Sequence, residues 1–471
     1  MLSQLFSNYL PSSKLLVHHG NSHSFGDLDQ LSQDMLENKV SGKLVLSLIQ
    51  NQPESLMGYL ALLKSEAVQM LQSEDIAESI LLNLIQRFQP SFIWLPTERV
   101  SELPLYKKCF EVESYSLITN EAFNVLVHPD LSILLSTSGS TGSPKFVRIS
   151  KHNLLENAKA IARYLDITSS ERPITSLPPS YTYGLSIIHS HIYAGASIIV
   201  TNKSFFDRSF WELFKELKAT SFGGVPFHYE MLKKLKFNEM DLPSLRTITQ
   251  AGGRMDPKLI SDFADVCLRR GIRFFSMYGQ VEATSRISFL DPSMISIKAG
   301  SIGKAIPGGK LSLKDENGVL LNSPHEIGEL IFKGPNVCMG YATCHEDLSK
   351  PDSNCGVLAT GDIAKMDEDG DFYIVGRKNR FLKLFGHRVN LHEVEVFLQK
   401  GGYISACTGT DDHLEIYIEG ANLEQLREVK RTATRFLKLS SKACSTYTID
   451  QFPRTTSGKI KYSELKPDNK E

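Results

Sequence analysis

Strand-like and helix-like runs alternate up to about residue 300 of this 471-residue chain, and this alternation constrains its fold most strongly. Residues 43–49 form an apolar run typical of a buried strand, and a second short strand is expected at residues 91–95. Residues 56–63 and 78–87 have the pattern of helices. Strands that alternate with helices in this way indicate a parallel sheet with helices on its faces.

The character of the sequence changes after about residue 300. Short strands between Gly, Pro, Asn and Asp turns are expected up to Val375. Residues 380–471 have the pattern of a small α+β unit. A single hydrophobic core stops growing near ~250–300 residues, so a chain of this length is expected to form more than one domain. The fold class predicted is therefore α/β. We expect a large N-terminal domain of mixed or parallel sheets layered with helices (residues 1–378) and a small, mobile α+β C-terminal domain (residues 379–471).

Composition and charge argue against several classes of protein. Lys and Arg number 52 against 53 Asp and Glu, so no overall basic field exists to attract nucleic acid or an anionic membrane. The seven cysteines contain no CxxC pair, which indicates a reduced protein without disulfides or a zinc site. No apolar run is long enough to span a membrane, and the first ten residues lack the pattern of a signal peptide. We expect a cytoplasmic location.

A loop rich in glycine and hydroxyl groups is the first feature that indicates chemistry. Residues 136–145 read STSGSTGSPK and lie between two apolar runs. Its glycines allow tight turns, and its backbone N–H groups, hydroxyls and lysine can hold the phosphates of a nucleotide. It is not a Walker loop, because GxxxxGK[ST] is absent. Taken alone, a loop of this composition is more often an exposed turn.

Six further motifs follow along the chain in a fixed order. They are residues 177–184 (LPPSYTYG), 251–254 (AGGR), 277–283 (MYGQVEA), 360–362 (TGD), 376–389 (GRKNRFLKLFGHRV) and 453–460 (PRTTSGKI). With the glycine-rich loop, this ordered set resembles the adenylate-forming superfamily of AMP-binding enzymes, which contains acyl-CoA synthetases, carrier-protein adenylation domains and luciferase-like enzymes. The resemblance runs from about residue 40 to residue 465.

The resemblance implies ATP and Mg²⁺ as cofactors and assigns residues to both. The residues implied to bind ATP are Ser138, Gly139, Ser140, Thr141, Gly142, Lys145, Gly252, Gly253, Arg254, Tyr278, Gly279, Asp362 and Arg377. Glu282 is implied to bind Mg²⁺, which makes a carboxylate tolerable beside a triphosphate and neutralises charge at phosphorus. The family usually has Thr where this chain has Val281. Either Thr284 supplies the missing hydroxyl or the contact with the α-phosphate is weaker.

Catalysis and domain movement are implied for the C-terminal motifs. Lys459 corresponds to the family's catalytic lysine, which a mobile domain can bring to the reacting carboxylate and α-phosphate. Asn379 stands at the hinge position, where an asparagine tolerates unusual backbone angles. Lys383 is implied to support the second half-reaction, and Gly386 would let a pantetheine arm pass close to the backbone.

The acid substrate is implied to lie against the aromatic segment. The candidates for contact with the acid are Tyr181, Tyr183, Gly184, Phe227, His228 and Met277. Amino-acid-activating relatives carry an Asp where this chain has Gly184, and that Asp pairs with the ammonium group of the substrate. We therefore expect an acid without an α-amine, such as a fatty, aryl or modified short acyl acid.

The function predicted is ATP-dependent activation of a carboxylic acid to acyl-AMP with release of pyrophosphate. The acyl group would then pass to the thiol of CoA or of a carrier-protein phosphopantetheine. One alternative is a ligase that activates an amino acid for a carrier protein, and another is a degenerate nucleotide-binding protein with a regulatory or scaffold role. A kinase is disfavoured by the missing Walker motif. The acid, the acceptor, the oligomeric state and the pathway stay open.

Overall fold

The computed structural model describes residues 2–136, 145–378, 380–384, 387–410, 412–437, 439–454, 460–465 and 469–470. The chain divides into two compact units. Unit 1 comprises Met1–Lys310 and Phe332–Leu358, and unit 2 comprises Leu311–Ile331 and Ala359–Glu471. The predicted boundary between residues 378 and 379 marks the expected hinge of the small domain, and it stays a prediction.

An eight-stranded mixed sheet forms the first layer of unit 1. Its strands, in spatial order, are β19 (Tyr341–Ala342), β9 (Phe146–Ser150), β8 (Leu131–Ser136), β4 (Val68–Ser73), β3 (Leu44–Ile49), β5 (Phe92–Pro96), β7 (Tyr115–Thr119) and β6 (Lys107–Val112). β3 pairs in parallel with both β4 and β5, and β4 pairs in parallel with β8. The antiparallel strands β6, β7, β9 and β19 lie toward the two edges. The parallel centre agrees with the predicted alternation of strands and helices.

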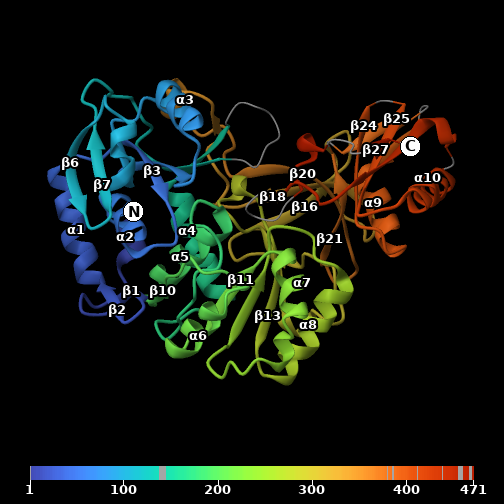
Figure 1. The fold of residues 1–471 in the computed structure, drawn as a ribbon, viewed down its shortest axis with the longest axis horizontal. Coiled ribbons are helices and arrows are strands. Elements are labelled where there is room, and N and C mark those ends of the chain that lie inside the picture. The colour runs from blue at the N-terminus through green and yellow to red at the C-terminus, as the bar shows by residue number, and fades with distance from the viewer. Residues whose placement is uncertain are drawn as a thin grey trace. The chain divides into compact units, whose positions relative to one another are not determined.

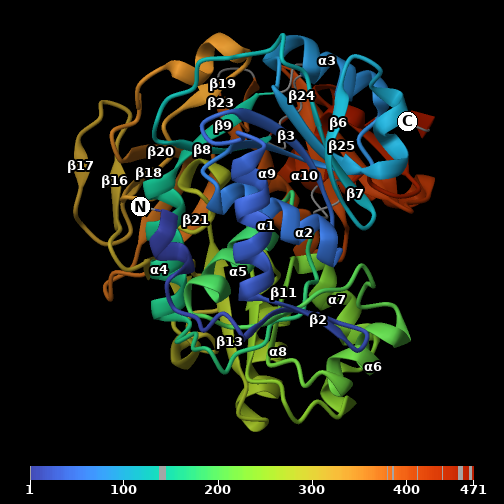
Figure 2. The same cartoon turned by 90° about the vertical axis from the view of Figure 1, so that its left-hand side faces the viewer.

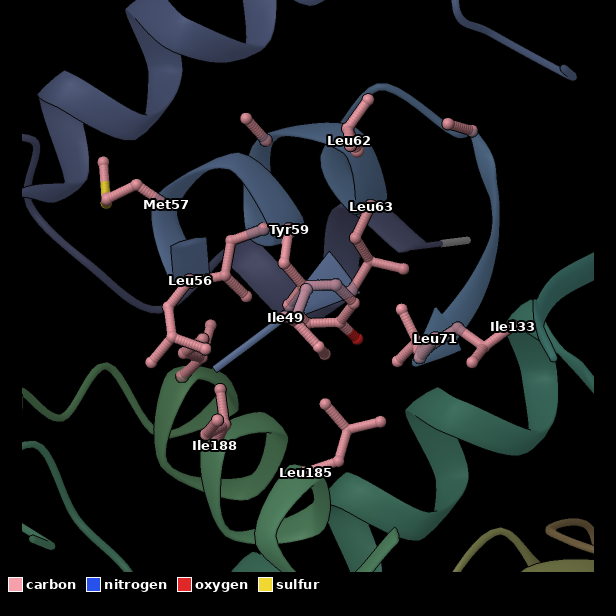
Figure 3. Packing of buried hydrophobic residues seen from close by; sticks show 14 of the residues in the cluster. Ile49, Leu56, Met57, Tyr59, Leu62, Leu63, Leu71, Ile133, Leu185 and Ile188 are labelled. Carbon is pink, nitrogen blue, oxygen red and sulfur yellow. The ribbon is translucent and has the colours of Figure 1, made fainter. Parts of the chain in front are cut away.

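Both faces of this sheet are covered by apolar side chains. Every residue of β3 is buried: Val45 and Ile49 belong to one core cluster, and Leu44, Leu46 and Leu48 belong to another. Figure 3 shows the first cluster, in which helix α2 (Pro53–Lys64) and helix α5 (Thr182–Tyr193) contribute residues such as Leu56 and Leu185. A strand buried on both faces needs no alternation of polar and apolar residues, which explains why Leu44–Ile49 is apolar at every position except Ser47.

The remaining helices of this region also contribute apolar residues to these two core clusters. Helix α1 (Phe25–Glu37) packs beside α2 (Figure 2), and α3 (Glu78–Phe88) supplies the second cluster. Helix α4 (Lys151–Tyr164) begins at Ser150, whose hydroxyl accepts a hydrogen bond from the backbone N–H of Asn153 at 3.0 Å. The Asn153 side chain accepts the backbone N–H of Ser150 in return, which completes a reciprocal helix cap. A small sheet of β1 (Lys14–His18), β2 (Asn21–Ser24) and β10 (Ile198–Ile199) lies in the same unit.

The second large sheet of unit 1 carries most of the candidate site. Its strands, in spatial order, are β11 (Ser221–Gly224), β12 (Thr247–Gln250), β13 (Arg273–Tyr278), β14 (Ser288–Leu290) and β15 (Lys304–Ala305). β11, β12 and β13 are parallel, so their carboxyl ends meet at one edge. Helices α7 (Pro226–Lys234) and α8 (Pro257–Arg269) run alongside β11 and β13 (Figure 1). Together with α6 (Arg208–Glu216), they share one core cluster with the strands of this sheet.

Unit 2 contains three sheets. The first has the order β17 (Leu320–Leu321), β16 (Lys310–Lys314), β18 (Ile327–Lys333), β20 (Val357–Met366) and β21 (Phe372–Arg377), and β22 (Phe381–Leu384) pairs with β23 (His387–Asn390). The last sheet has β24 (Ser405–Thr410), β25 (His413–Glu419), β26 (Cys444–Ile449) and β27 (Asn469–Lys470), with α9 (Leu391–Lys400) and α10 (Leu423–Leu437). Short 3₁₀ helices are η1 (Leu2–Phe6), η2 (Thr97–Glu102), η3 (Phe237–Glu239), η4 (Val281–Ala283), η5 (Pro292–Met294), η6 (His345–Ser349), η7 (Ser441–Ala443) and η8 (Tyr462–Glu464).

These elements confirm the predicted α/β class, with a large N-terminal part of layered mixed sheets and a smaller C-terminal α+β part. No helix in the described part of the chain is long and apolar enough to cross a membrane.

The contact between Gly58 and Trp94 gives a testable prediction for the core. A Cβ atom at Gly58 would lie 2.1 Å from the ring of Trp94, which is fully buried. Gly58→Ala gains up to ~1 kcal/mol of helix propensity. We expect the overlap to outweigh that gain, so that the free energy of unfolding in urea falls by ~1–3 kcal/mol. The loss should shrink in a Trp94→Phe background, and an unchanged stability of Gly58→Ala would contradict the packing.

Candidate active site

The chain makes a tight excursion, residues 279–287, between β13 and β14. A Cβ atom at Gly279 would lie 1.7 Å from the backbone oxygen of Ser285, so only glycine fits at the start of this loop. The backbone N–H of Ile287 donates to the oxygen of Tyr278 at 2.9 Å and closes the loop. Tyr278 and Glu282, both predicted to contact the nucleotide or its metal, are therefore held by one local structure.

Asn336 fixes this loop from a distant part of unit 1. Its side-chain amide donates to the backbone oxygens of Ala283 and Arg286, both at 2.8 Å. The backbone oxygen of Asn336 accepts the hydroxyl of Thr284 at 2.7 Å, and the N–H of Cys338 donates to the oxygen of Glu282 at 2.8 Å. Asn336 is 1% exposed. Sequence reasoning missed this residue, because a lone asparagine in a loop carries no recognisable signal.

The same contacts show that Thr284 does not supply the hydroxyl that Val281 lacks. The Thr284 hydroxyl is buried and donates to Asn336, so it does not present its proton to a ligand. Val281 is half-buried and packs against the core cluster of the first sheet. Neither side chain offers the hydroxyl that the family usually places before the metal-binding glutamate.

Glu282 lies in a group with Tyr341 and Lys145. The Tyr341 hydroxyl donates to Oε1 of Glu282 at 3.1 Å. Nζ of Lys145 lies 3.4 Å from the centroid of the Tyr341 ring, a geometry in which the cation is attracted to the ring face. Burial and the neighbouring carboxylate raise the pKa of Tyr341, so the phenol remains a donor. Tyr341 was not predicted, although it connects two residues that were.

The turn predicted to lie at the adenine side follows β12 directly. Gly252 has φ of +84°, and a Cβ atom there would lie 2.4 Å from the Tyr181 hydroxyl. The Gln250 side chain donates to the backbone oxygen of Gly253 at 2.9 Å, and Arg254 follows as an exposed residue. Because β12 and β13 are parallel, this turn and Tyr278 follow neighbouring strand ends at the same edge.

The residues predicted to contact the acid separate into two places. Tyr181, Tyr183 and Met277 belong to one apolar cluster, in which the Tyr183 hydroxyl donates to the backbone oxygen of Thr249 at 2.7 Å. His228 lies apart from them in α7, with its ring edge-on to Phe205 at 4.9 Å between centroids. Burial lowers the pKa of His228 to about 4, so this histidine is neutral.

Gly184 has a packing role. A Cβ atom at this position would lie 2.4 Å from the backbone oxygen of Pro178 and 2.9 Å from that of Leu177. Helix α5 therefore approaches the preceding segment too closely for any side chain at its third residue. An aspartate that would pair with an ammonium group does not fit here.

A cavity of about 30 Å³ lies between α4, α5, β11 and β12. Polar residues that line it are Glu171, Ser186, Ser190, His191, Ser221, Thr247, Thr249, Arg273 and Arg286. None of the residues predicted to contact the acid lines it. The sequence analysis passed over Arg286, because a single arginine after the MYGQVEA motif is not distinctive.

In unit 2, Asp362 and Arg377, both implied by the resemblance to bind ATP, come together. They are paired across β20 and β21, and Nε of Arg377 donates to Oδ1 of Asp362 at 2.8 Å. The Asp362 side chain is 3% exposed and the Arg377 side chain 60% exposed. Gly361 precedes the aspartate with φ of +71°, and its backbone oxygen accepts the N–H of Lys378 at 2.7 Å.

The other predicted site residues fall outside what the structure describes. These are Ser138, Gly139, Ser140, Thr141, Gly142, Asn379, Gly386 and Lys459. Lys383 lies in β22, where its backbone is paired with Arg388 of β23. The roles given to these residues stay predictions.

Comparison with known proteins identifies the family. The model of the AMP-binding enzyme family matches residues 11–342, which is more than half of the chain. The chain belongs to the AMP-binding enzyme family. This result confirms the predicted membership of the adenylate-forming superfamily and the prediction of an AMP-forming acid–thiol ligase.

Individual members of the AMP-binding enzyme family resemble most of the chain. An oxalate–CoA ligase of Arabidopsis thaliana is 28% identical over 358 residues, which cover 73% of this chain and 68% of the relative. A 2-succinylbenzoate–CoA ligase of Bacillus pumilus is 24% identical, with 97% of this chain and 95% of the relative covered. The solved structure of O-succinylbenzoate coenzyme A synthetase from Bacillus subtilis with AMP has a TM-score of 0.78 and 21% identity, covering 100% and 98%. That structural likeness shows the shared fold.

The Asn336 contacts of this AMP-binding enzyme predict a large effect on stability. Asn336→Ala would leave the buried oxygen of Arg286 without a donor and the oxygen of Ala283 with only the N–H of Ser285. We expect the free energy of unfolding, measured in urea, to fall by ~2–4 kcal/mol, since an unsatisfied buried group costs ~1–3 kcal/mol and a lost hydrogen bond ~0.5–1.5 kcal/mol. Asn354→Ala is the matched control, because that half-buried amide donates to one backbone oxygen, of Cys338 at 2.9 Å. An equal loss in both variants would contradict the special role of Asn336.

The buried histidines of α5 predict a loss of stability in mild acid. Burial lowers the pKa of His189 to about 3 and that of His191 to about 4. Histidine in the unfolded chain titrates near ~6.5, so below that pH the unfolded state binds more protons than the folded state. Stability should therefore be lost as the pH falls from about 6.5 toward 4, by roughly 2 kcal/mol per histidine between about pH 7 and about pH 5. Urea unfolding across this range measures the effect, and His191→Gln should make the dependence shallower.

Proposed function

We propose that the protein activates a carboxylic acid without an α-amine as its acyl-adenylate and then transfers the acyl group to coenzyme A. The observation that carries this proposal is the group formed by Lys145, Tyr341 and Glu282, which presents a cation and a carboxylate at the end of the glycine-rich loop. Asp362 with Arg377 supplies a second pair of the type that the family uses at ribose. The CoA ligases among the relatives support CoA as the acceptor.

The residues of this chain fit the role of Mg²⁺ and phosphate ligands. Glu282 is a half-buried carboxylate whose Oε1 is oriented by the Tyr341 phenol, and carboxylate oxygen is a ligand that Mg²⁺ prefers. Mg²⁺ bound at Glu282 would neutralise negative charge on the triphosphate. Lys145, adjoining the glycine-rich loop, would hold the leaving pyrophosphate together with the loop hydroxyls.

The chemical task is to bring two anions together in line. The carboxylate oxygen attacks the α-phosphorus of ATP, the bond to pyrophosphate breaks, and a mixed anhydride with AMP remains. No base is needed for this step, so positioning and charge stabilisation provide the catalysis. We assign Lys459 to the charge that develops between the carboxylate and the α-phosphate. In the second step the thiol of CoA attacks the activated carbonyl and AMP leaves, with Lys383 assigned to support this step and Asn379 to the hinge.

The geometry at Gly184 argues against the alternative of an amino-acid substrate. The position that carries an aspartate in amino-acid-activating relatives has no room for a side chain, because Pro178 and Leu177 oxygens lie too close. A carrier-protein thiol as acceptor and a regulatory role without catalysis remain as outcomes of the experiment. The cytoplasmic location stays a prediction.

The test is acid-dependent exchange of labelled pyrophosphate into ATP with Mg²⁺ across fatty, aryl, hydroxy and amino acids. We expect exchange with acids that lack an α-amine. Lys459→Ala should reduce its rate by roughly 10²–10³-fold, the usual cost of removing a group that stabilises developing charge. Lys461→Ala, which removes an exposed lysine paired with Glu464 at 2.9 Å, should keep the wild-type rate.

The acceptor is tested by adding CoA or a phosphopantetheinylated carrier protein to the preformed adenylate. Release of AMP with CoA, together with the acyl-CoA product, would support the proposal. Exchange without turnover by CoA would favour the carrier protein. A folded protein that binds ATP but exchanges no pyrophosphate with any acid would favour the regulatory role, and release of ADP would indicate a kinase.

A further inference from the structure

Arg286 is a buried cation in unit 1 that the proposed mechanism does not use. Its side chain leaves the loop 279–287 just before β14 and is 3% exposed. The guanidinium lies over the ring of Tyr183, 4.1 Å from the centroid, and Nη1 donates to the Ser285 hydroxyl at 2.6 Å. Nε has no hydrogen-bond partner. The Nε–H donor of the guanidinium is therefore left unsatisfied in the interior.

No carboxylate forms an ion pair with Arg286 among the residues that the structure describes. Burying a charge without a counter-charge is costly, and such groups are normally paired. The positive charge of Arg286 acts on the nearby Tyr164 hydroxyl. Burial raises the pKa of Tyr164, and the charge of Arg286 partly offsets this rise. Arg286 thus remains a cation that lacks a counter-charge within unit 1.

Arg148 shows how this chain satisfies a buried arginine when the role is structural. Arg148 is 2% exposed, and its Nε also lacks a partner. Its guanidinium, however, donates through both terminal nitrogens to the backbone oxygens of Lys350 and Pro351. Within the described ranges of the chain, Arg286 donates to no backbone oxygen in a way that would give it a comparable structural role.

The cavity beside Arg286 has an excess of positive charge. Glu171 also lines it, but the Glu171 carboxylate accepts the Thr220 hydroxyl and pairs with Arg246 at 3.4 Å. Arg273, the other cation of the lining, lies 3.9 Å from the Asp166 carboxylate. Burial lowers the pKa of His191 to about 4, so His191 adds no charge near neutral pH. The guanidinium of Arg286 is left as the uncompensated charge.

The cavity is also small. Its volume of about 30 Å³ holds roughly two water molecules, since one needs ~10–15 Å³ on the same measure. Two oxygen atoms of a carboxylate need a similar space, whereas a long alkyl chain does not fit. A guanidinium edge binds a carboxylate through two parallel hydrogen bonds, and an unpaired Nε is half of such an edge.

We infer that the acid substrate is a short dicarboxylic acid whose second carboxylate, the one that is not activated, binds Arg286 from this cavity. This inference rests on the proposed function and names the substrate class for it. Arg286 is then a specificity-determining residue: it selects the acid and does not take part in adenylate formation. The unsatisfied Nε of Arg286 is explained as the donor that the substrate completes.

The experiment compares pyrophosphate exchange with pairs of acids of equal chain length, one monocarboxylic and one dicarboxylic, such as butyrate and succinate or hexanoate and adipate. We expect the wild type to have a KM roughly 10- to 100-fold lower for the diacid, since a hydrogen-bonded charge pair contributes ~1.5–3 kcal/mol. Arg286→Met should lose this preference by raising KM for the diacid with kcat for the monoacid unchanged. Arg286→Lys should keep part of it, because the charge remains without the planar fork.

Arg148→Met is the matched control, since it removes a second buried arginine that lies outside the cavity. It should leave the acid preference unchanged and lower the melting temperature, because the oxygens of Lys350 and Pro351 lose their donor. Arg286→Met should keep or raise the melting temperature, because replacing an uncompensated buried charge with an apolar side chain of similar size removes a cost. Added diacid should raise the melting temperature of the wild type and not that of Arg286→Met.

The outcomes separate this inference from the proposed function. Exchange with monoacids and diacids at similar KM would overturn the inference and leave the proposed function intact. An equal loss with both members of each pair in Arg286→Met would place the reacting carboxylate at Arg286 and would also overturn it. If no acid supports exchange, the proposed function fails and the melting temperatures decide: a shift by diacid only in proteins with Arg286 supports the inference, and no shift overturns it.

Discussion

The hydrogen bonds from the Asn336 side chain to the loop 279–287 are the interaction on which the candidate site depends. One buried amide satisfies two backbone oxygens, and the backbone oxygen of the same residue accepts Thr284. The loop could not otherwise bury its backbone, because unpaired carbonyl groups in the interior are costly. With the close approach at Gly279, these contacts give the loop a single conformation.

That conformation places three side chains to which we assign three different roles. Tyr278 remains at the end of β13, beside the strand that leads to the adenine-side turn. Glu282 meets the Tyr341 phenol, and Arg286 lies over the Tyr183 ring next to the cavity. The residues proposed for the nucleotide, the metal and the acid therefore lie within one short segment, so a distortion of the loop would displace all three. Gly252 approaches the Tyr181 hydroxyl too closely for a Cβ atom, so the turn predicted for adenine lies against the segment predicted for the acid.

The sequence allowed the fold class and several motifs to be predicted because these depend on local patterns. The apolar run of β3, the helix cap at Ser150 and the pairing of Asp362 with Arg377 are recognisable from residues a few positions apart or from an ordered motif. Asn336 and Tyr341 act on Ala283 and Glu282, more than fifty positions away, and no periodicity marks such contacts. Thr284 is the converse case. Its position in the sequence suggested a contact with phosphate, but its buried hydroxyl donates to Asn336 and stabilises the loop.

The difference between neutral and charged groups explains why Arg286 is informative when other unsatisfied groups are not. Neutral buried atoms without partners also occur elsewhere in the described residues, for example in Gln72 and Ser132. Such groups cost ~1–3 kcal/mol each, which a folded domain can tolerate. A guanidinium cannot become neutral at physiological pH, so its cost is relieved only by an anion or by several oriented dipoles. Arg148 receives such dipoles from two backbone oxygens, whereas the cavity beside Arg286 has the size and charge to receive the anion.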